Sequence, residues 1–348
     1  MFLNDILARF ENNIEVENIT DQSEIILKNR VLQNALKEII AFTANLAHPA
    51  QGHTYQRWQI FAQVAATNLT LAKWFESHCD ALSILNELNI QHSYNGVWAV
   101  WAAEGSSQPL RCHSNHCSGE KLWCSGADFV EYGLCTYKNE NAQSQLCIID
   151  MNNKGIVIDH SKWQAVGMKD TRTATLTLSD VAVENVGEPD DYLNRVGFWH
   201  GAAGVAACWF GATVRIASFL EKEFMRKSTA FNAMYFGEVV AHLAMIKKLF
   251  KALAEQIDQQ PDVSHELEIR VLRFHVEQTA KKVIDLVGNA LGARPFCENA
   301  IFAQLVSDLP VFLRQSHAAY ELERIAHLSL DQSNSAIDAN QEQNVWML

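Results

Sequence analysis

The sequence predicts an α+β protein that consists of an N-terminal helical domain, a middle antiparallel β-barrel or β-sandwich and a C-terminal four-helix bundle. Two observations lead to this prediction. The period of the hydrophobic residues changes from helical to strand-like near residue 94 and becomes helical again near residue 191. Only six prolines occur in 348 residues, which favours long uninterrupted helices. The expected boundaries are 1–93, 94–190 and 191–330, followed by a polar tail over 331–348.

The N-terminal part is predicted to be helical because its apolar residues recur mostly at three- and four-residue steps. Leu32, Leu36 and Ile39 belong to one such stripe, and a second stripe runs from Trp58 to Leu88. The segment 47–52, which reads Ala-His-Pro-Ala-Gln-Gly, is expected to separate the two as a loop.

The middle part is predicted to be a small β domain. Short runs rich in Val, Ile, Thr, Tyr and Trp alternate there with clusters of Gly, Asn, Asp and Ser. The last run, Arg172–Leu178, alternates polar and apolar residues, which is typical of a strand with one face in water. The expected strands are 97–101, 121–124, 129–137, 145–149, 155–158 and 172–178.

The C-terminal part returns to helical spacing, as expected for a bundle whose helices are joined by short loops. Pro310 is expected to break or to start a helix, with Asp308 just before it as the N-cap. The Gly/Ala-rich stretch 201–217 would suit packing between subunits. Four long helices are expected, at about 192–222, 232–259, 263–291 and 299–328.

The composition argues against several classes of protein. The net charge of −12 makes the chain a poor partner for phosphate backbones, so no nucleic-acid binding is expected. The most apolar window, 197–220, contains His200 and Arg215, so no membrane span is expected either. The eight cysteines are scattered without a disulfide framework, which indicates free thiols in a reducing cytoplasm.

One cluster contains the ligand types of a zinc site. Cys112, His113, His116 and Cys117 lie close in sequence, with Cys124 nearby, and four soft ligands suit tetrahedral Zn²⁺. Adjacent Cys and His residues point to opposite faces of a strand, however, and the chain has no Cys-x-x-Cys pair. We therefore expect no metal there.

Five strings, in the same order along the chain, resemble the acyl-CoA dehydrogenase superfamily of flavoproteins over roughly residues 20–328. One of them is similar to a helix of a little-characterised bacterial branch of that superfamily. The resemblance implies the three-part fold described above, with FAD between the β domain and the bundle. The strings are Trp74–Leu82, Val100–Ser107, Gly119–Asp128, the segment from Trp163 to Val183, and Gly288–Gly292.

The resemblance implies α,β-dehydrogenation of an acyl thioester, carried on CoA or on a carrier protein, with hydride transfer to flavin N5. Such chemistry needs a base near the α-carbon, and an electron acceptor or O₂ to reoxidise the flavin. The resemblance also implies a homodimer or homotetramer in which a partner subunit's Gly-rich turn reaches the FAD. The implied cofactor-binding residues are Trp101, Ala102, Ala103, Ser106, Trp123, Ser125, Gly288 and Asn289.

The usual catalytic Glu of the superfamily is absent from this chain. The equivalent stretch, 307–317, reads Ser-Asp-Leu-Pro-Val-Phe-Leu-Arg-Gln-Ser-His, and Ser316 falls roughly at the position of the Glu. His200 and His317 are the candidate catalytic residues, with His200 preferred because it precedes a Gly/Ala helix that permits close approach of a cofactor. The alternatives are a buried structural role for His200 and a solvated one for His317. Glu104, within the flavin-covering string, is expected to orient its loop.

Two further functions remain open from the sequence. Members of this superfamily that lack the base can act as monooxygenases with reduced flavin and O₂, and the string Cys124–Ala127 fits that branch as well. A catalytically degenerate homologue that binds an acyl group or a partner is the third hypothesis. Bound flavin would separate it from the two enzymes.

Overall fold

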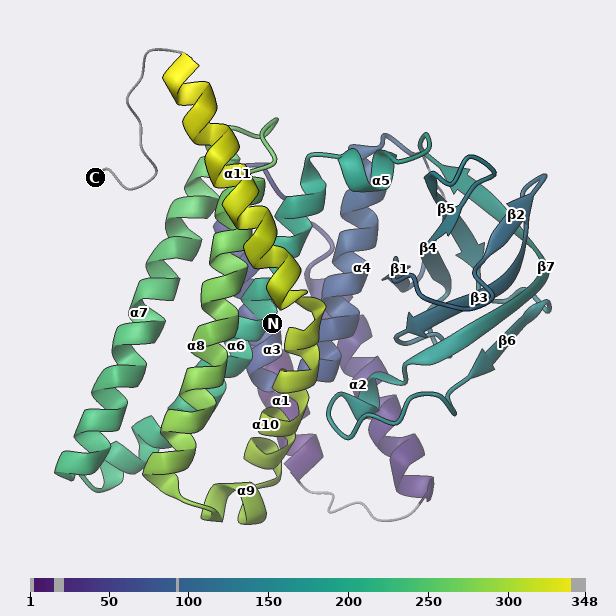
Figure 1. The fold of residues 1–348 in the computed structure, drawn as a ribbon. Coiled ribbons are helices and arrows are strands. Elements are labelled where there is room, and N and C mark those ends of the chain that lie inside the picture. The colour runs from purple at the N-terminus through teal and green to yellow at the C-terminus, as the bar shows by residue number, and fades with distance from the viewer. Residues whose placement is uncertain (1–2, 16–21, 92–93, 339–348) are drawn as a thin grey trace.

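The computed structural model describes residues 3–15, 22–91 and 94–338, and its elements follow the predicted order of helices, strands and helices (Figure 1). The predicted α+β fold class is therefore confirmed. In Figure 1 the strands lie at one side of the molecule and the long helices at the other, with α4 between them. The N-terminal helices are α1 Leu3–Glu15, α2 Gln22–Phe42, α3 Thr54–Thr67 and α4 Leu69–Glu87.

The predicted helical stretch from Trp58 to Leu88 is interrupted once, at Asn68. This residue has an extended backbone that ends α3, and its side-chain oxygen accepts a hydrogen bond from the backbone N–H of Leu71 at 2.9 Å. An Asn at this position satisfies one of the N–H groups that a new helix leaves free. The chain therefore turns at Asn68 and continues as α4.

Seven strands form the middle part: β1 Trp98–Trp101, β2 Arg111–His113, β3 His116–Cys124, β4 Tyr132–Lys138, β5 Ser144–Asp150, β6 Ile156–Asp159 and β7 Ala174–Val186. They are ordered β1-β4-β5-β7-β3-β2, and β6 also pairs with β7. Every pairing is antiparallel except β1 with β4, which departs from the predicted all-antiparallel sheet. The long β7 joins the two halves of the sheet, because β5 pairs with its end and β3 with its beginning.

The prediction of a water-exposed face for residues 172–178 is wrong. Thr173 and Thr175 are buried, as are Leu176 and Leu178 on the opposite face. The hydroxyl of Thr173 lies 2.8 Å from that of Ser125 and 2.8 Å from that of Thr171. The polar face of this strand is thus turned toward other parts of the protein rather than toward water.

Helix α4 covers the edge of the sheet at β1. The backbone N–H of Val100 donates to the hydroxyl of Ser77 at 2.8 Å, and the N–H of Trp98 donates to Nδ1 of His78 at 3.1 Å. Burial lowers the pKa of His78 to about 4, so its ring is neutral and can accept this bond. The helix therefore fixes the position of β1 and of the loop that follows it.

The C-terminal part begins with the short helix α5 and ends with α11. The predicted helix 299–328 is divided by the turn Leu313–Gln315, and Pro310 lies inside α10 instead of breaking it. Asn299 caps α10, whereas the carboxylate of Asp308 accepts from the N–H of Met168, so the prediction of Asp308 as an N-cap is wrong. The elements are α5 Asp191–Asn194, α6 Gly197–Arg226, α7 Ala230–Gln259, α8 Glu266–Leu291, α9 Arg294–Glu298, α10 Ala300–Phe312 and α11 Ala318–Asp338.

The segment predicted as a polar tail overlaps the last helix. Residues 331–338 continue α11, while 339–348 lie outside the described residues. The helix α6 is long and apolar enough to cross a membrane by length and composition, but 67% of its most apolar window is buried inside the protein. It therefore has the character of a core helix.

Small residues of α6 pack against α3 of the same chain, while the expected role of this stretch in packing between subunits stays a prediction. A Cβ atom added at Gly211 would lie 2.0 Å from the carbonyl oxygen of Ala62, and one at Gly204 would lie 3.0 Å from the ring of Phe61. These glycines let the two helices approach closely.

We therefore expect Gly211→Ala to lower the free energy of unfolding by about 2 kcal/mol, because the added methyl group must displace helix backbone. Gly237→Ala is the matched control. Gly237 also lies inside a helix, α7, but its added Cβ meets nothing within 4 Å, so this change should raise stability by about 0.5–1 kcal/mol. Urea unfolding of both variants measures the difference, and equal effects would contradict the packing.

One pair of cysteines is not free. Cys112 and Cys117 form a disulfide across the β2–β3 hairpin, which corrects the prediction that all the cysteines are free thiols. These two sulfurs are then not available as zinc ligands. Within the described part of the chain, no three or more His, Cys, Asp or Glu side chains are grouped so that they could hold a metal ion.

Candidate active site

A cavity of about 660 Å³ lies between the strands and the helices. The β wall consists of residues of β1, of β3 and of the loops after them, and of the segment before β7. The helical wall consists of residues of α4, α5, α6, α8 and α10, and of the α5–α6 and α10–α11 links. The lining residues include Lys73, Glu76, Ser77, Asp80, Val100, Trp101, Ala102, Ala103, Trp123, Ser125, Trp163, Ala165, Met168, Thr171, Thr173, Tyr192, Arg195, Phe198, Gly201, Ala202, Val205, Arg273, Val311, Phe312, Arg314, Gln315 and His317.

The β wall presents one aromatic face. Trp123 is 59% exposed and adopts a positive φ of 57°, which turns its ring out of the sheet. Trp101 is buried beside it, with its ring packed on Gly133 and its Nε1 donating to the carbonyl of Ser125 at 3.2 Å. The Ser125 hydroxyl pairs with Thr173, as described above. This wall therefore combines a flat ring with two fixed hydroxyl groups.

The segment 160–173 closes the cavity toward α10. Gly167 packs directly on the helix, because an added Cβ would lie 1.9 Å from the carbonyl oxygen of Ser307. The N–H of Met168 donates to Asp308, and burial raises the pKa of that carboxyl to about 6. On the other side, Nε1 of Trp74 donates to the carbonyl of Thr171 at 3.0 Å. The segment is thus anchored to both α4 and α10.

One face of α4 supplies charged groups to the helical wall. Glu76 is 4% exposed, and its carboxylate lies 3.5 Å from Nζ of Lys73. Burial raises the pKa of Glu76 to about 7, and the nearby Asp80 acts in the same direction, while Lys73 and Arg57 oppose the shift. A buried carboxyl group with a pKa near neutrality can hold or release a proton at working pH.

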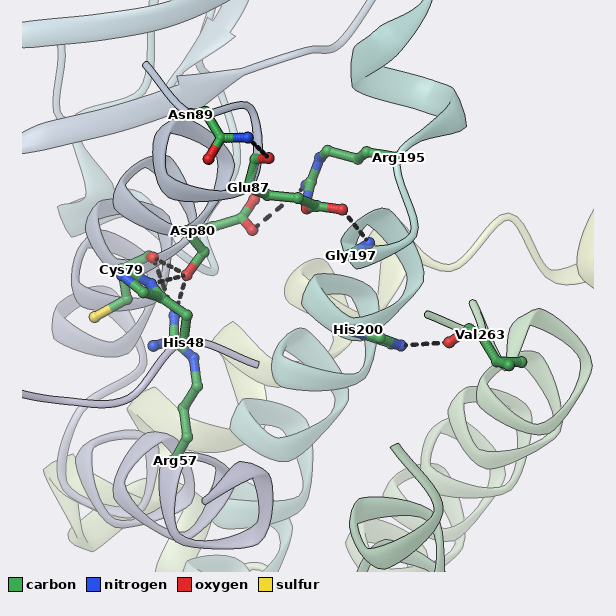
Figure 2. A network of polar contacts seen from close by, with 11 residues as sticks. His48, Arg57, Cys79, Asp80, Glu87, Asn89, Arg195, Gly197, His200 and Val263 are labelled. Carbon is green, nitrogen blue, oxygen red and sulfur yellow. Dashed lines mark hydrogen bonds and ion pairs between the residues drawn. The ribbon is translucent and has the colours of Figure 1, made fainter. Parts of the chain in front are cut away.

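Arg195 joins α4 to the start of α6. Its guanidinium lies 2.8 Å from Glu87 and 3.7 Å from Asp80, and Glu87 also accepts from the N–H of Gly197 at 2.7 Å. Figure 2 shows Asp80 and Glu87 turned toward Arg195. A side chain at Gly201 would collide with Asp80, so the glycine leaves room for this ion pair.

His200 is not among the residues that line the cavity. Its Nε2 lies 2.9 Å from the carbonyl oxygen of Val263, and Figure 2 shows the ring turned toward that residue and away from Arg195. Burial lowers the pKa of His200. Its role as the base stays a prediction, and the geometry favours the structural alternative, a buried and hydrogen-bonded histidine at a helix start.

The other predicted residues divide into two groups. Trp101, Ala102, Ala103, Trp123, Ser125 and His317 line the cavity. Ser106 lies outside it and donates to Glu120 at 2.9 Å, Gly288 packs against Phe296, and Asn289 is exposed on α8. Their cofactor-binding roles stay predictions. Glu104 accepts from Lys121 at 3.2 Å and from Thr136 at 2.8 Å, which fits the expected role in orienting its loop.

Sequence reasoning missed the charged residues of the helical wall. Glu76 on α4, Arg195 in the α5–α6 link and Arg273 on α8 line the cavity, and none was a candidate. One signal was present: Lys73, Glu76 and Asp80 recur at helical spacing in a segment that is otherwise almost entirely buried. Polar residues on one face of a buried helix must find partners or line a cavity.

Comparisons with known proteins identify the fold of this chain. No protein-family model matches the chain, and no curated protein matches its sequence. Solved structures do match, with TM-scores of 0.71–0.75. They include dibenzothiophene monooxygenase (TdsC) from Paenibacillus sp. A11-2, at 14% identity over 95% of this chain and 97% of that one with a TM-score of 0.74. The chain has the acyl-CoA dehydrogenase fold.

Two further structures support the same fold. Nitrososynthase from Micromonospora carbonacea var. africana matches at 11% identity over 94% of each chain, with a TM-score of 0.75. Methanesulfinate monooxygenase MsuC from Pseudomonas fluorescens matches at 15% identity over 95% of this chain and 96% of that one, with a TM-score of 0.73. At these identities the likeness concerns the fold. The resemblance found in the sequence is thereby confirmed at that level.

Proposed function

We propose that this chain is a flavin-dependent monooxygenase that uses reduced flavin and O₂. The observation that carries the proposal is the end of α10 at the cavity. Where the superfamily resemblance places the catalytic Glu of acyl-CoA dehydrogenation, the residues that reach the cavity are Arg314, Gln315 and His317, and none of them is a carboxylate. Two of the solved structures with the same fold, TdsC and MsuC, are monooxygenases by name.

The residues of the β wall fit a flavin. The cavity volume lies within the roughly 300–1,000 Å³ typical of ligand sites. The exposed ring of Trp123 offers a face for an isoalloxazine, and Ser125 and Thr173 offer hydroxyls for its polar edge. Structures of TdsC and of KijD3 contain FMN, which favours FMN over the FAD expected from the sequence.

A bound reduced flavin would supply the two electrons that convert O₂ into one oxygen atom for the substrate and one for water. The chain itself would hold the reactants and exclude bulk water, since Trp163, Phe198 and Phe312 form apolar walls. Glu76 would hold a proton inside the cavity. No two of the 16 glycines stand two positions apart, so the chain lacks the Gly-x-Gly string of a dinucleotide fingerprint, and we propose that a separate reductase supplies the reduced flavin.

Dehydrogenation of an acyl thioester is the second candidate, and Glu76 is the observation that favours it. A buried carboxyl with a pKa of about 7 in the cavity could serve as a relocated base. The two functions differ in what reduces the flavin. In a dehydrogenase the substrate does so, whereas in the proposed monooxygenase an external reductant does.

The test begins with an absorbance spectrum of the purified protein, before and after incubation with FMN or FAD and desalting. We expect retained flavin bands, with FMN retained at least as well as FAD. Chemically reduced flavoprotein should then consume O₂ rapidly, while anaerobic addition of short- and long-chain acyl-CoA should leave the oxidised bands unchanged. Anaerobic bleaching by acyl-CoA would replace the monooxygenase with the dehydrogenase. A protein that binds neither FMN nor FAD, in the oxidised or in the reduced form, would exclude both and leave the degenerate homologue.

A further inference from the structure

We propose that Arg273 is an anion-binding residue of the cavity, and that the substrate of the proposed function is therefore an organic acid whose singly charged oxyanion contacts this guanidinium. The inference rests on the proposed function and names its substrate class. Arg273 belongs to α8, is 5% exposed and lines the cavity.

The hydrogen bonds of Arg273 leave its charge without a counter-ion. Nη1 donates to the carbonyl oxygen of Ala202 at 2.6 Å, and Nη2 donates to that of Gln315 at 3.2 Å. Nε is buried without any hydrogen-bond partner. A guanidinium has five N–H donors, so neutral carbonyls occupy only a part of its capacity. Burial lowers the pKa of Arg273 to about 10, which still leaves it charged at neutral pH.

The nearby carboxylates are paired with other cations. Glu321 lies 2.5 Å from Arg270, Glu277 lies 2.5 Å from Lys281 and 3.1 Å from Arg314, and Glu76 lies 3.5 Å from Lys73. No ion pair joins Arg273 to a carboxylate of the described residues. Burying a charge without a partner is costly, so a ligand that supplies the opposite charge would bind favourably there.

The other buried arginines show why Arg273 is different. Arg195 and Arg270 each lie within ion-pair distance of two carboxylates. Arg57 has no carboxylate partner either, but it donates to two carbonyls and to the hydroxyl of Ser83, and it does not line the cavity. Arg273 alone among these four combines a missing counter-ion with access to the cavity.

The surroundings of Arg273 would strengthen an ionic contact. Its guanidinium lies 4.7 Å from the ring centroid of Trp209, and apolar side chains such as Val205 and Phe312 line the same wall. A charge-assisted hydrogen bond is stronger in surroundings of low polarity than in water. The lining as a whole contains four Lys or Arg side chains and two carboxylates, although the chain has a net charge of −12. Arg195 and Arg314 are paired with Glu87 and Glu277, and Lys73 with Glu76, so Arg273 is the cation of the lining that has no carboxylate partner among the described residues.

The position of Arg273 favours the substrate over a flavin phosphate. It belongs to the helical wall of the cavity, whereas the residues that fit the flavin ring belong to the β wall. One guanidinium charge also matches a carboxylate or sulfonate, whereas a phosphate monoester carries nearly two negative charges at neutral pH. A flavin lying on the β wall would leave Arg273 to the molecule that occupies the remaining space.

Titrations with small acids test the proposal without turnover. Acetate, benzoate and benzenesulfonate, with benzamide as the neutral match for benzoate, are added to the protein with and without FMN, and tryptophan fluorescence and thermal unfolding are recorded. We expect at least one acid to bind the wild-type protein and to raise its Tm, at least tenfold weaker binding in Arg273→Met, and unchanged binding of benzamide. Arg273→Lys, which keeps the charge and loses the fork of donors, should retain part of the affinity and provides the comparison if Arg273→Met does not fold.

The remaining outcomes overturn the inference. Equal acid affinity in the wild type and the variants would do so, as would the absence of binding by every acid. FMN and riboflavin are titrated in parallel, and a preference for FMN that disappears in Arg273→Met would assign Arg273 to the flavin phosphate instead. A protein that binds the acids through Arg273 but binds neither oxidised nor reduced flavin would refute the proposed function and leave the anion site standing.

Discussion

Replacing Gly167 by valine is expected to lower the free energy of unfolding by about 3 kcal/mol and to abolish ligand binding in the cavity. The first Cβ atom would lie 1.9 Å from the carbonyl oxygen of Ser307 and 2.9 Å from a methyl group of Val311. The nearer atom belongs to the backbone of α10 and cannot move aside like the end of a side chain. Overpacking of this kind costs about 1–3 kcal/mol and sometimes more, and the rigid branched side chain favours the upper end.

The loss of binding should follow because the segment would separate from α10. Five residues that line the cavity, from Trp163 to Thr173, belong to this segment, and its bond from Met168 to Asp308 would be lost with it. Urea unfolding and FMN titration measure the two effects. Val166→Ala is the matched control, because Val166 is 82% exposed in the same segment and should change stability by less than about 0.5 kcal/mol. A Gly167→Val protein with wild-type stability would refute the docking of the segment on α10.

Glu76→Gln is expected to remove a large part of the pH dependence of stability. An ordinary glutamate has a pKa of 4.5, and burial raises that of Glu76 to about 7 in the folded protein. Below pH 4.5 the group is protonated in both states. As the pH rises toward 7, only the unfolded state loses the proton, so the folded state is destabilised by about 1.4 kcal/mol per pH unit. Above pH 7 this cost is constant.

The variant should therefore be more stable than the wild type at pH 8, by about 3 kcal/mol, and the difference should vanish near pH 4.5. Asp308, whose pKa is also raised, contributes the same trend to both proteins and cancels in the comparison. Glu255→Gln is the control, because Glu255 is exposed beside Lys251 and should behave like the wild type. A constant difference across pH would show that Glu76 is ionised throughout. The charged and titratable groups around Glu76 are Lys73, Asp80, Arg57, Arg273, Cys79, Cys208 and Tyr192.

The spacing of the apolar residues predicted the long helices and strands, because each of these elements buries a regular stripe of apolar side chains. It could not predict where one helix ends and the next begins, since that depends on one side chain: Asn68 ends α3 and caps α4. The prediction that Pro310 breaks or starts a helix was wrong for a related reason. Pro310 lies in the last turn of α10, and the adjacent Asp308 is used by Met168, 140 residues earlier in the chain. Only the tertiary structure contains that contact. The strand β2 has three residues, too few for a period.

The two walls of the cavity differed in how far they could be predicted. Trp101, Ala102, Trp123 and Ser125 belong to short contiguous strings, and each string carries its resemblance to the superfamily within a few neighbouring residues. The helical wall takes Glu76, Arg195 and Arg273 from two helices and one link that are far apart in the sequence. In the sequence, each of these three residues is indistinguishable from an ordinary polar surface residue. Their burial and their unequal pairing arise only when the helices pack.

The bonds between α4 and β1 have a consequence for the behaviour of the protein in concentrated solution. A strand with unpaired N–H groups at the margin of a sheet can recruit a strand from another molecule, which is a common start of aggregation. Here Ser77 and His78 already occupy the N–H groups of Val100 and Trp98. Since the pKa of His78 is about 4, its nitrogen stays an acceptor down to mildly acidic pH. The helix that presents Glu76 to the cavity thus also prevents this margin of the sheet from growing by addition of a second chain.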